Sequence, residues 1–209
     1  MRKFFEIGGV VAAVVLIAFG ITSIVVGLNG RDTVQSSLKQ EQIVGSPDMT
    51  PAAIKAEAAK AGLKNVVLPT ADVAGKTIDT GAEAKAFAGY MRIHALEATG
   101  GQTYAEMGRF LDANGKPTSD ESKAAVDPKT GKPVENGLRN LWVTETALAT
   151  ALNTSFFAEQ VALFSIVMGI ALLLTGIGFL VLTAGGALGY GFSMASKKAT
   201  PKPTPVPTH

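Results

Sequence analysis

Two long uncharged stretches, separated by a mostly polar segment, dominate the pattern of hydrophobic and polar positions along this chain. The first stretch runs over 7–30 and the second over 160–196. Each exceeds the roughly 20 apolar residues that an α-helix needs to cross a ~30 Å hydrocarbon core. The pattern therefore predicts two transmembrane helices that flank one sizeable water-exposed domain.

Helix-capping signals appear early in the polar segment. Thr50 followed by proline indicates a helix start, and the helix over 51–61 is expected to end at Gly62. Thr80–Glu83 forms a capping box that opens a helix over 81–98. Both patterns favour a helical domain between the spans.

The rest of the polar segment is less regular. A second capping box, Thr103–Glu106, predicts a shorter helix through about Asp112. Residues 66–69 fit either a short strand or a linker, and the turn-rich residues 113–136 are interpreted as a surface excursion. From about Leu138 the helical pattern returns and is expected to run into the second span.

The predicted fold class is all-α, with two transmembrane helices flanking an extracytoplasmic helical domain. The predicted parts are a cytoplasmic N-terminus (1–6), transmembrane helix 1 (7–30), the extracytoplasmic domain (31–158), transmembrane helix 2 (159–186) and a cytoplasmic proline-rich tail (187–209).

The distribution of basic residues sets the expected orientation. Lysine and arginine near span ends face the cytoplasm, and here they are Arg2, Lys3, Lys197, Lys198 and Lys202, with Arg31 alone near the outer ends. We expect a multi-pass cell-membrane protein with both termini cytoplasmic.

The first apolar run exceeds the 7–15 residues of a signal-peptide core and lacks an A-x-A-like site, which favours an uncleaved anchor.

Small residues recur at seven-residue intervals in both spans, which predicts a helix-packing seam. The two seams are expected to face each other or another subunit. The seam residues are Gly9, Ala13, Gly20, Ser23 and Gly27 in the first span, and Ala162, Ser165, Gly169, Gly176 and Thr183 in the second.

Composition excludes several classes of function. The net charge of +2 gives no nucleic-acid footprint, and the lack of cysteine excludes disulfides and thiolate chemistry. Neither span carries an internal charge of the kind that marks proton or ion paths.

The expected partners are membrane lipid and either other membrane subunits or further copies of this chain.

Candidate chemistry centres on His94, the sole histidine besides His209 in the tail. His94 is interpreted as a partly buried polar residue; a proton-transfer group or metal ligand is the alternative. A catalytic zinc or non-haem iron site normally has two or three histidines. We therefore expect no catalytic residue, no metal and no cofactor. Phe87, Met91, His94 and Trp142 form the candidate interaction surface.

Three pieces of the chain, 43–51, 90–97 and 141–148, resemble a group of actinobacterial two-span envelope proteins of unknown function. The resemblance implies an envelope location and carries no known chemistry. Members of the group are often labelled aromatic ring-opening dioxygenases. That activity needs an iron site, which one external histidine does not supply.

These observations lead to an expected function that is non-catalytic. The chain is predicted to be an accessory or scaffold subunit of a larger cell-envelope or respiratory membrane assembly. A homo-oligomeric passive pore or sensor is the alternative, and a binder of lipid or envelope ligand is a further one.

Overall fold

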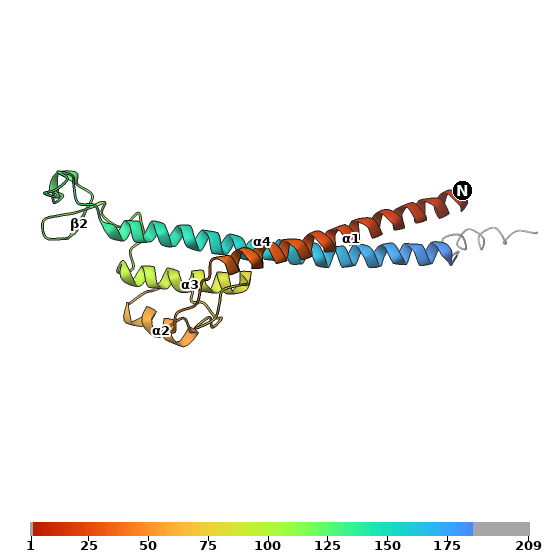
Figure 1. Ribbon diagram of the computed structural model, residues 1–209, viewed down its shortest axis with the longest axis horizontal. Coiled ribbons are helices and arrows are strands. Elements are labelled where there is room, and N and C mark those ends of the chain that lie inside the picture. Colours follow the sequence, from red (N-terminus) through yellow and green to blue (C-terminus); the bar gives the residue numbers. More distant parts are fainter. Residues whose placement is uncertain (1, 186–209) are drawn as a thin grey trace, which may run out of the picture. The chain divides into compact units, whose positions relative to one another are not determined.

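The computed structural model describes residues 2–185 of the chain, and these residues are mostly helical (63 % helix, four α-helices; Figure 1). The chain divides into two compact units. The apolar unit is formed by residues up to Asn29 and from Ala162 onward, and the polar unit is Gly30–Val161. The predicted tail (187–209), with Lys197, Lys198, Lys202 and His209, lies outside the described residues.

Two long helices contribute to both units. Helix α1 is Arg2–Gln40 and helix α4 is Gly137–Ala184, with 39 and 48 residues. At 1.5 Å per residue they are about 58 and 72 Å long, well beyond a ~30 Å hydrocarbon core. The predicted continuation of a helix from about Leu138 into the second span is confirmed. Asn136 caps it, because its Oδ1 accepts a hydrogen bond from the backbone N–H of Leu138 at 3.1 Å.

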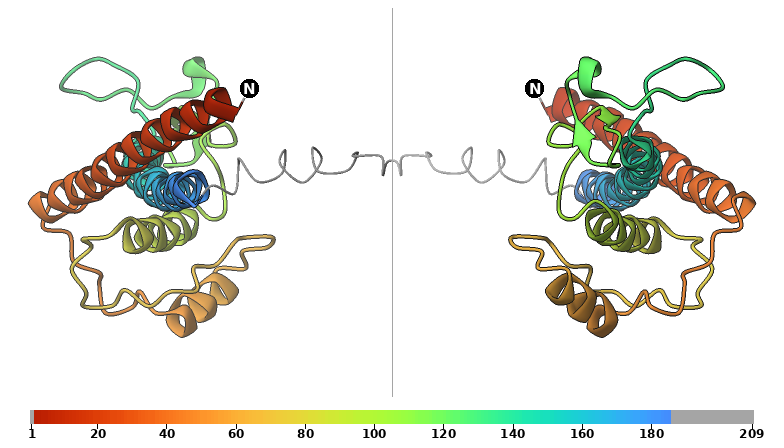
Figure 2. Two further views of the ribbon diagram at one scale, coloured as in Figure 1. Left: turned by 90° about the vertical axis from the view of Figure 1, so that its right-hand side faces the viewer. Right: turned by 90° about the vertical axis from the view of Figure 1, so that its left-hand side faces the viewer.

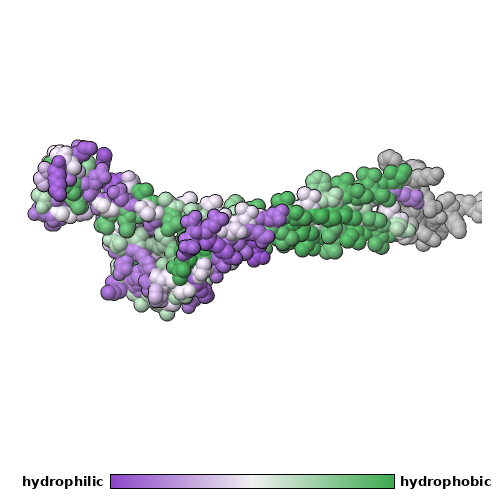
Figure 3. Space-filling view, in the orientation of Figure 1, coloured by the Kyte–Doolittle hydropathy of each residue, from purple (hydrophilic) through white to green (hydrophobic). Residues whose placement is uncertain are grey.

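Both long helices are apolar enough to cross a membrane. Only 17 % and 11 % of their most apolar windows is buried within the structure, which distinguishes them from the core helices of a soluble protein. Large apolar side chains such as Phe19, Phe164 and Val181 are 64–65 % exposed. Figure 3 shows hydrophobic residues gathered along the face of the apolar unit that it presents.

The polar unit contains two further helices, α2 (Pro51–Lys60) and α3 (Gly81–Ala98). Helix α3 lies between α4 and α2 (Figures 1 and 2). Their shared core includes Leu38 from α1, Met49, Val73 and Ile78 from the loops, Ile54 and Ala58 from α2, Ala84, Ala86, Ala88, Tyr90 and Ile93 from α3, and Ala149 and Leu152 from α4. Tyr90 is fully buried, and its hydroxyl donates a 2.9 Å hydrogen bond to the carbonyl of Ala71.

The predicted caps of α2 and α3 are confirmed. The Thr50 hydroxyl accepts a hydrogen bond from the N–H of Ala53, and Gly62 takes a φ of +67° just beyond α2. At α3, Thr80 and Glu83 form the reciprocal capping box, with the Glu83 carboxylate bonded to the Thr80 N–H at 3.1 Å. These ends were readable from sequence because the hydrogen bonds involved are local.

The helix predicted from Thr103 through Asp112 is wrong. Only half of the capping box forms: the Glu106 carboxylate accepts the Thr103 N–H at 2.7 Å, but the Thr103 hydroxyl donates to that carboxylate instead of accepting the Glu106 N–H. Only one turn follows. Gly108 packs against the backbone of a later segment, where an added Cβ would lie 2.5 Å from the nitrogen of Thr118. That approach draws the chain out of the helical path into strand β1, Phe110–Leu111.

The segment 113–136 contains paired backbone that an all-α class does not predict. Strand β1 pairs antiparallel with β2 (Pro117–Thr118). Further along the segment, an isolated antiparallel bridge joins Val126 to Pro133. A 3-10 turn, Glu121–Lys123, follows β2. The class is therefore mostly helical, with a small β element. Residues 66–69 have no regular structure.

Candidate functional site

The small-residue seams of the two long helices face each other in the apolar unit. An added Cβ at Gly20 would lie 2.8 Å from the carbonyl oxygen of Gly169, and one at Gly27 would lie 2.7 Å from that of Ala162. At Gly176 the corresponding distance to the carbonyl oxygen of Ala13 is 3.0 Å. Each heptad step along α1 thus matches one heptad step back along α4.

The remaining predicted seam residues border this contact. Gly9 is buried, whereas Ser23, Ser165 and Thr183 are half-buried. The Thr183 hydroxyl donates to the carbonyl of Phe179 at 2.7 Å, which satisfies it within its own helix. The close approach is therefore made by glycine and alanine, because their lack of bulk lets two backbones touch.

The residues proposed as an interaction surface occupy different environments. Phe87 and Met91 are half-buried and pack against the core of the polar unit. Trp142 is only 8 % exposed and packs with Ala95 and Met107 in a second small core. Sequence pattern gave no means of separating these roles, since an apolar stripe on a helix suits either a core or an interface.

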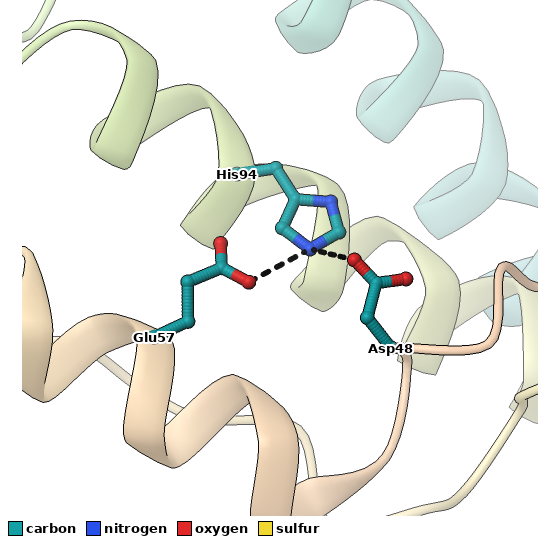
Figure 4. Close-up of side chains that lie close together, drawn as sticks. All are labelled: Asp48, Glu57 and His94. Atoms are coloured by element: carbon teal, nitrogen blue, oxygen red, sulfur yellow. Dashed lines mark ion pairs between the residues drawn. The ribbon is translucent and has the colours of Figure 1, made fainter.

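His94 lies in a cluster of acidic side chains in the polar unit (Figure 4). Its Nε2 is 3.4 Å from Oε2 of Glu57 and 3.5 Å from Oδ2 of Asp48. One ligand atom from each of the three residues lies within 4.8 Å of the others. The three residues thus offer a nitrogen and two carboxylate oxygens to one point.

Three separate elements bring the cluster together. His94 is on α3 and Glu57 is on α2, while Asp48 follows the end of α1 in a loop. That loop is fixed by Gly45, whose backbone packs against the Val73 carbonyl so closely that a Cβ would collide with it. The Ser46 hydroxyl donates to Asp48 Oδ1 at 2.5 Å and orients the carboxylate.

The electrostatics of the cluster are dominated by negative charge. Burial raises the pKa of Glu57, and a hydrogen bond with the neighbouring Glu97 raises it further. The Ser46 hydrogen bond lowers the pKa of Asp48. Among residues 2–185, no lysine or arginine forms an ion pair with Asp48, Glu57 or Glu97. In the part of the chain that the structure describes, the imidazole is therefore the one basic group within ion-pair distance of these carboxylates.

Sequence reasoning singled out His94 but missed its carboxylate partners. Asp48 and Glu57 lie 46 and 37 positions earlier in the chain, so no motif spacing connects them.

Comparisons with known proteins add no relative. No family model, no curated protein and no solved structure matches this chain. The chemistry of its sites therefore carries the functional conclusions.

A second feature of the polar unit is a groove of about 610 Å³ between the 67–71 linker, α3 and α4. Its lining is mainly apolar, with two cationic side chains, Lys85 and Arg92. The Arg92 guanidinium pairs with the Glu145 carboxylate at 3.1 Å. The Lys85 ammonium lies 4.4 Å from the centre of the Phe156 ring. The groove has the size and apolar character of a small-ligand pocket.

Proposed function

We propose that this chain is a non-catalytic accessory subunit that is anchored in a membrane by two helices and binds other membrane subunits through its polar unit. In this proposal both termini are cytoplasmic and the polar unit is extracytoplasmic. The basic residues beside the terminal ends of the two spans, with Arg31 alone near the outer ends, support that orientation, because positive charge is retained on the cytoplasmic side. The assembly belongs to the cell envelope or to a respiratory complex.

The observation that carries this proposal is an apolar flank on the polar-unit part of α4. Leu141 and Leu148, seven residues apart, are 43 % and 37 % exposed. Leu38 of α1 and Ala149 of α4 belong to the same buried core, but α1 ends at Gln40, whereas α4 extends from Ala149 back to Gly137. The flank continues where its companion helix has ended.

An apolar stripe with a seven-residue repeat is the surface that a second helix uses in knobs-into-holes packing. Exposure of two leucines in water is a cost that a partner helix removes, at about 25 cal/mol per Å² of buried apolar area. The flank therefore favours a helical partner above one that presents a loop or a polar sheet edge.

Affinity purification from native membranes in mild detergent, followed by native mass spectrometry, tests this function. We expect recovery of other membrane polypeptides at a fixed stoichiometry. Leu141→Glu and Leu148→Glu should abolish that recovery. Ala147→Glu is the matched control, because Ala147 is exposed on the same helix away from the two leucines.

Two outcomes would overturn the accessory role. Recovery of this chain alone, in a ring of defined size, would replace it with the homo-oligomeric pore or sensor. Recovery of partners that is unaffected by both leucine substitutions would remove the α4 flank as the binding surface.

A second candidate function, binding of a lipid or envelope ligand, is favoured by the groove between α3 and α4. An amphiphile with an acidic headgroup suits apolar walls bordered by Lys85 and Arg92. Ala82→Phe would fill the groove, and Ala98→Phe, at an exposed position near the end of α3, is its control. Mass spectrometry should detect a co-purified acidic lipid in the parent and the control but not in Ala82→Phe.

A further inference from the structure

We propose that His94, Asp48 and Glu57 form a binding site for a divalent transition-metal ion of the zinc class. This site goes beyond the proposed assembly role and stands independently of it. The ion would connect the loop after α1, helix α2 and helix α3, which are the three elements that supply the ligands.

The distances around His94 Nε2 suit metal ligands better than hydrogen-bonding partners. Its separations of 3.4 and 3.5 Å from the two carboxylate oxygens exceed the usual hydrogen-bond range of about 2.7–3.2 Å. Tetrahedral zinc with bonds of about 2.0–2.2 Å places its ligand atoms roughly 3.3–3.6 Å apart. The observed separations match the edges of such a tetrahedron.

Unpartnered polar atoms give a second, independent indication. His94 Nε2 and Glu57 Oε1 are both buried and have no hydrogen-bond partner in the structure. Leaving a buried polar atom without a partner is unfavourable, because the atom has lost its hydrogen bonds to water. A cation coordinated by Nε2 and the Glu57 carboxylate would satisfy both residues.

The charge of the site also calls for a cation. The carboxylates of Asp48 and Glu57 lie 3.5 and 3.4 Å from the same imidazole nitrogen, and one oxygen of each lies within 4.8 Å of the other. Two carboxylates this close repel each other when both are ionised. A divalent ion removes that repulsion, which a neutral imidazole does not.

The donor set selects the kind of metal. An imidazole nitrogen suits zinc and its neighbours, whereas magnesium and calcium take oxygen ligands almost exclusively. Three protein ligands leave the fourth position to water. The exposed fractions of the side chains, 30 % for His94 and 52 % for Asp48, leave a path by which an ion can enter.

The test uses the full chain in mild detergent, purified on a tag without histidine and stripped of metal with a chelator. Titration calorimetry with Zn²⁺ should show one saturable site, and Co²⁺ should give the visible absorption of a tetrahedral complex. His94→Gln and Asp48→Asn should each weaken binding at least about tenfold. His209→Gln is the matched control and should leave binding unchanged.

Thermal unfolding with and without Zn²⁺ separates a specific site from surface binding. Because a ligand bound only to the folded state stabilises it, Zn²⁺ should raise the melting temperature of the parent and not that of Asp48→Asn. If circular dichroism shows that His94→Gln does not fold, the Zn²⁺ response of Asp48→Asn alone tests the site, because Asp48 lies in a loop with a half-exposed side chain. Absence of saturable Zn²⁺ binding, or tight binding that survives Asp48→Asn, would overturn the site.

Discussion

The Glu159 carboxylate accepts a hydrogen bond from the backbone N–H of Gly81 at 2.7 Å, so a side chain of α4 binds the first turn of α3. Its second oxygen accepts from Arg31 Nε at 3.1 Å, and the Glu159 side chain is only 5 % exposed. A negative charge is favourable at a helix N-terminus, where N–H groups lack partners. One buried carboxylate thereby joins α1, α3 and α4.

Glu159→Gln should destabilise the polar unit by about 1–3 kcal/mol, because it replaces charged hydrogen bonds and leaves Arg31 without its partner. The free energy of unfolding, measured by denaturant titration in detergent, checks this expectation. Asp32→Asn, at an exposed neighbouring position, is the control and should change little. An equal effect of both substitutions would contradict a structural role for the Glu159 contacts.

Gly176 and Gly178 provide a matched test of the seam. A Cβ at Gly176 would lie 2.8 Å from the Ile17 side chain and 3.0 Å from the carbonyl of Ala13, whereas Gly178 has nothing within 4 Å. Gly176→Val should destabilise the helix pair by roughly 1–3 kcal/mol through overpacking. Gly178→Val should be nearly neutral. Resistance to unfolding in detergent mixtures measures both, and equal stability of the two variants would contradict the close backbone contact.

The stability of the polar unit should carry a pH dependence from Glu145. Burial raises the pKa of Glu145, and the nearby Arg92 opposes that shift only in part. A carboxyl with a raised folded-state pKa binds its proton more tightly when folded. Its contribution to stability is therefore greatest below the unfolded pKa of about 4.3 and is lost as the pH rises through the folded value. Glu145→Gln should flatten this part of the melting temperature profile.

Glu83 should act in the opposite direction. Burial alone would raise its pKa, but hydrogen bonds from Thr80 and Asp79 outweigh burial and lower it. The stability that it contributes is present above the unfolded pKa and is lost as the pH falls through the lower folded value. In Glu83→Gln the acid-side loss of melting temperature should be smaller than in the parent. An unchanged acid limb would show that the box does not contribute in this way.

The proposed topology can be tested directly because the chain has no cysteine. Ser119→Cys introduces one thiol in an exposed loop of the polar unit, and Ser196→Cys introduces one near the C-terminal lysines. In intact cells, a membrane-impermeant maleimide should label Ser119→Cys and not Ser196→Cys. Lysed cells supply the control, in which both thiols should react. Labelling of Ser196→Cys alone in intact cells would reverse the orientation.

Local signals account for the features that could be predicted. Thr80 and Glu83 predicted the start of α3 correctly, because their hydrogen bonds are confined to four consecutive residues. Thr103 and Glu106 form only the carboxylate half of that pattern, and no helix follows, because Gly108 is engaged by the backbone of Thr118. A capping box determines where a turn can begin, and contacts from later in the chain decide how far it continues.

The same distinction between local and distant contacts holds for the candidate sites. The sequence by itself determined two apolar stretches long enough to cross a membrane, and the seven-residue spacing of Gly20, Gly27, Gly169 and Gly176. It could do so because each of these features depends on residues that are close together in the chain. Only the tertiary structure decided that Gly20 lies against Gly169, and that Asp48 and Glu57 meet at His94. The first contact depends on how α1 and α4 pack, and the second on how α2 and α3 pack; neither leaves a fixed spacing in the sequence.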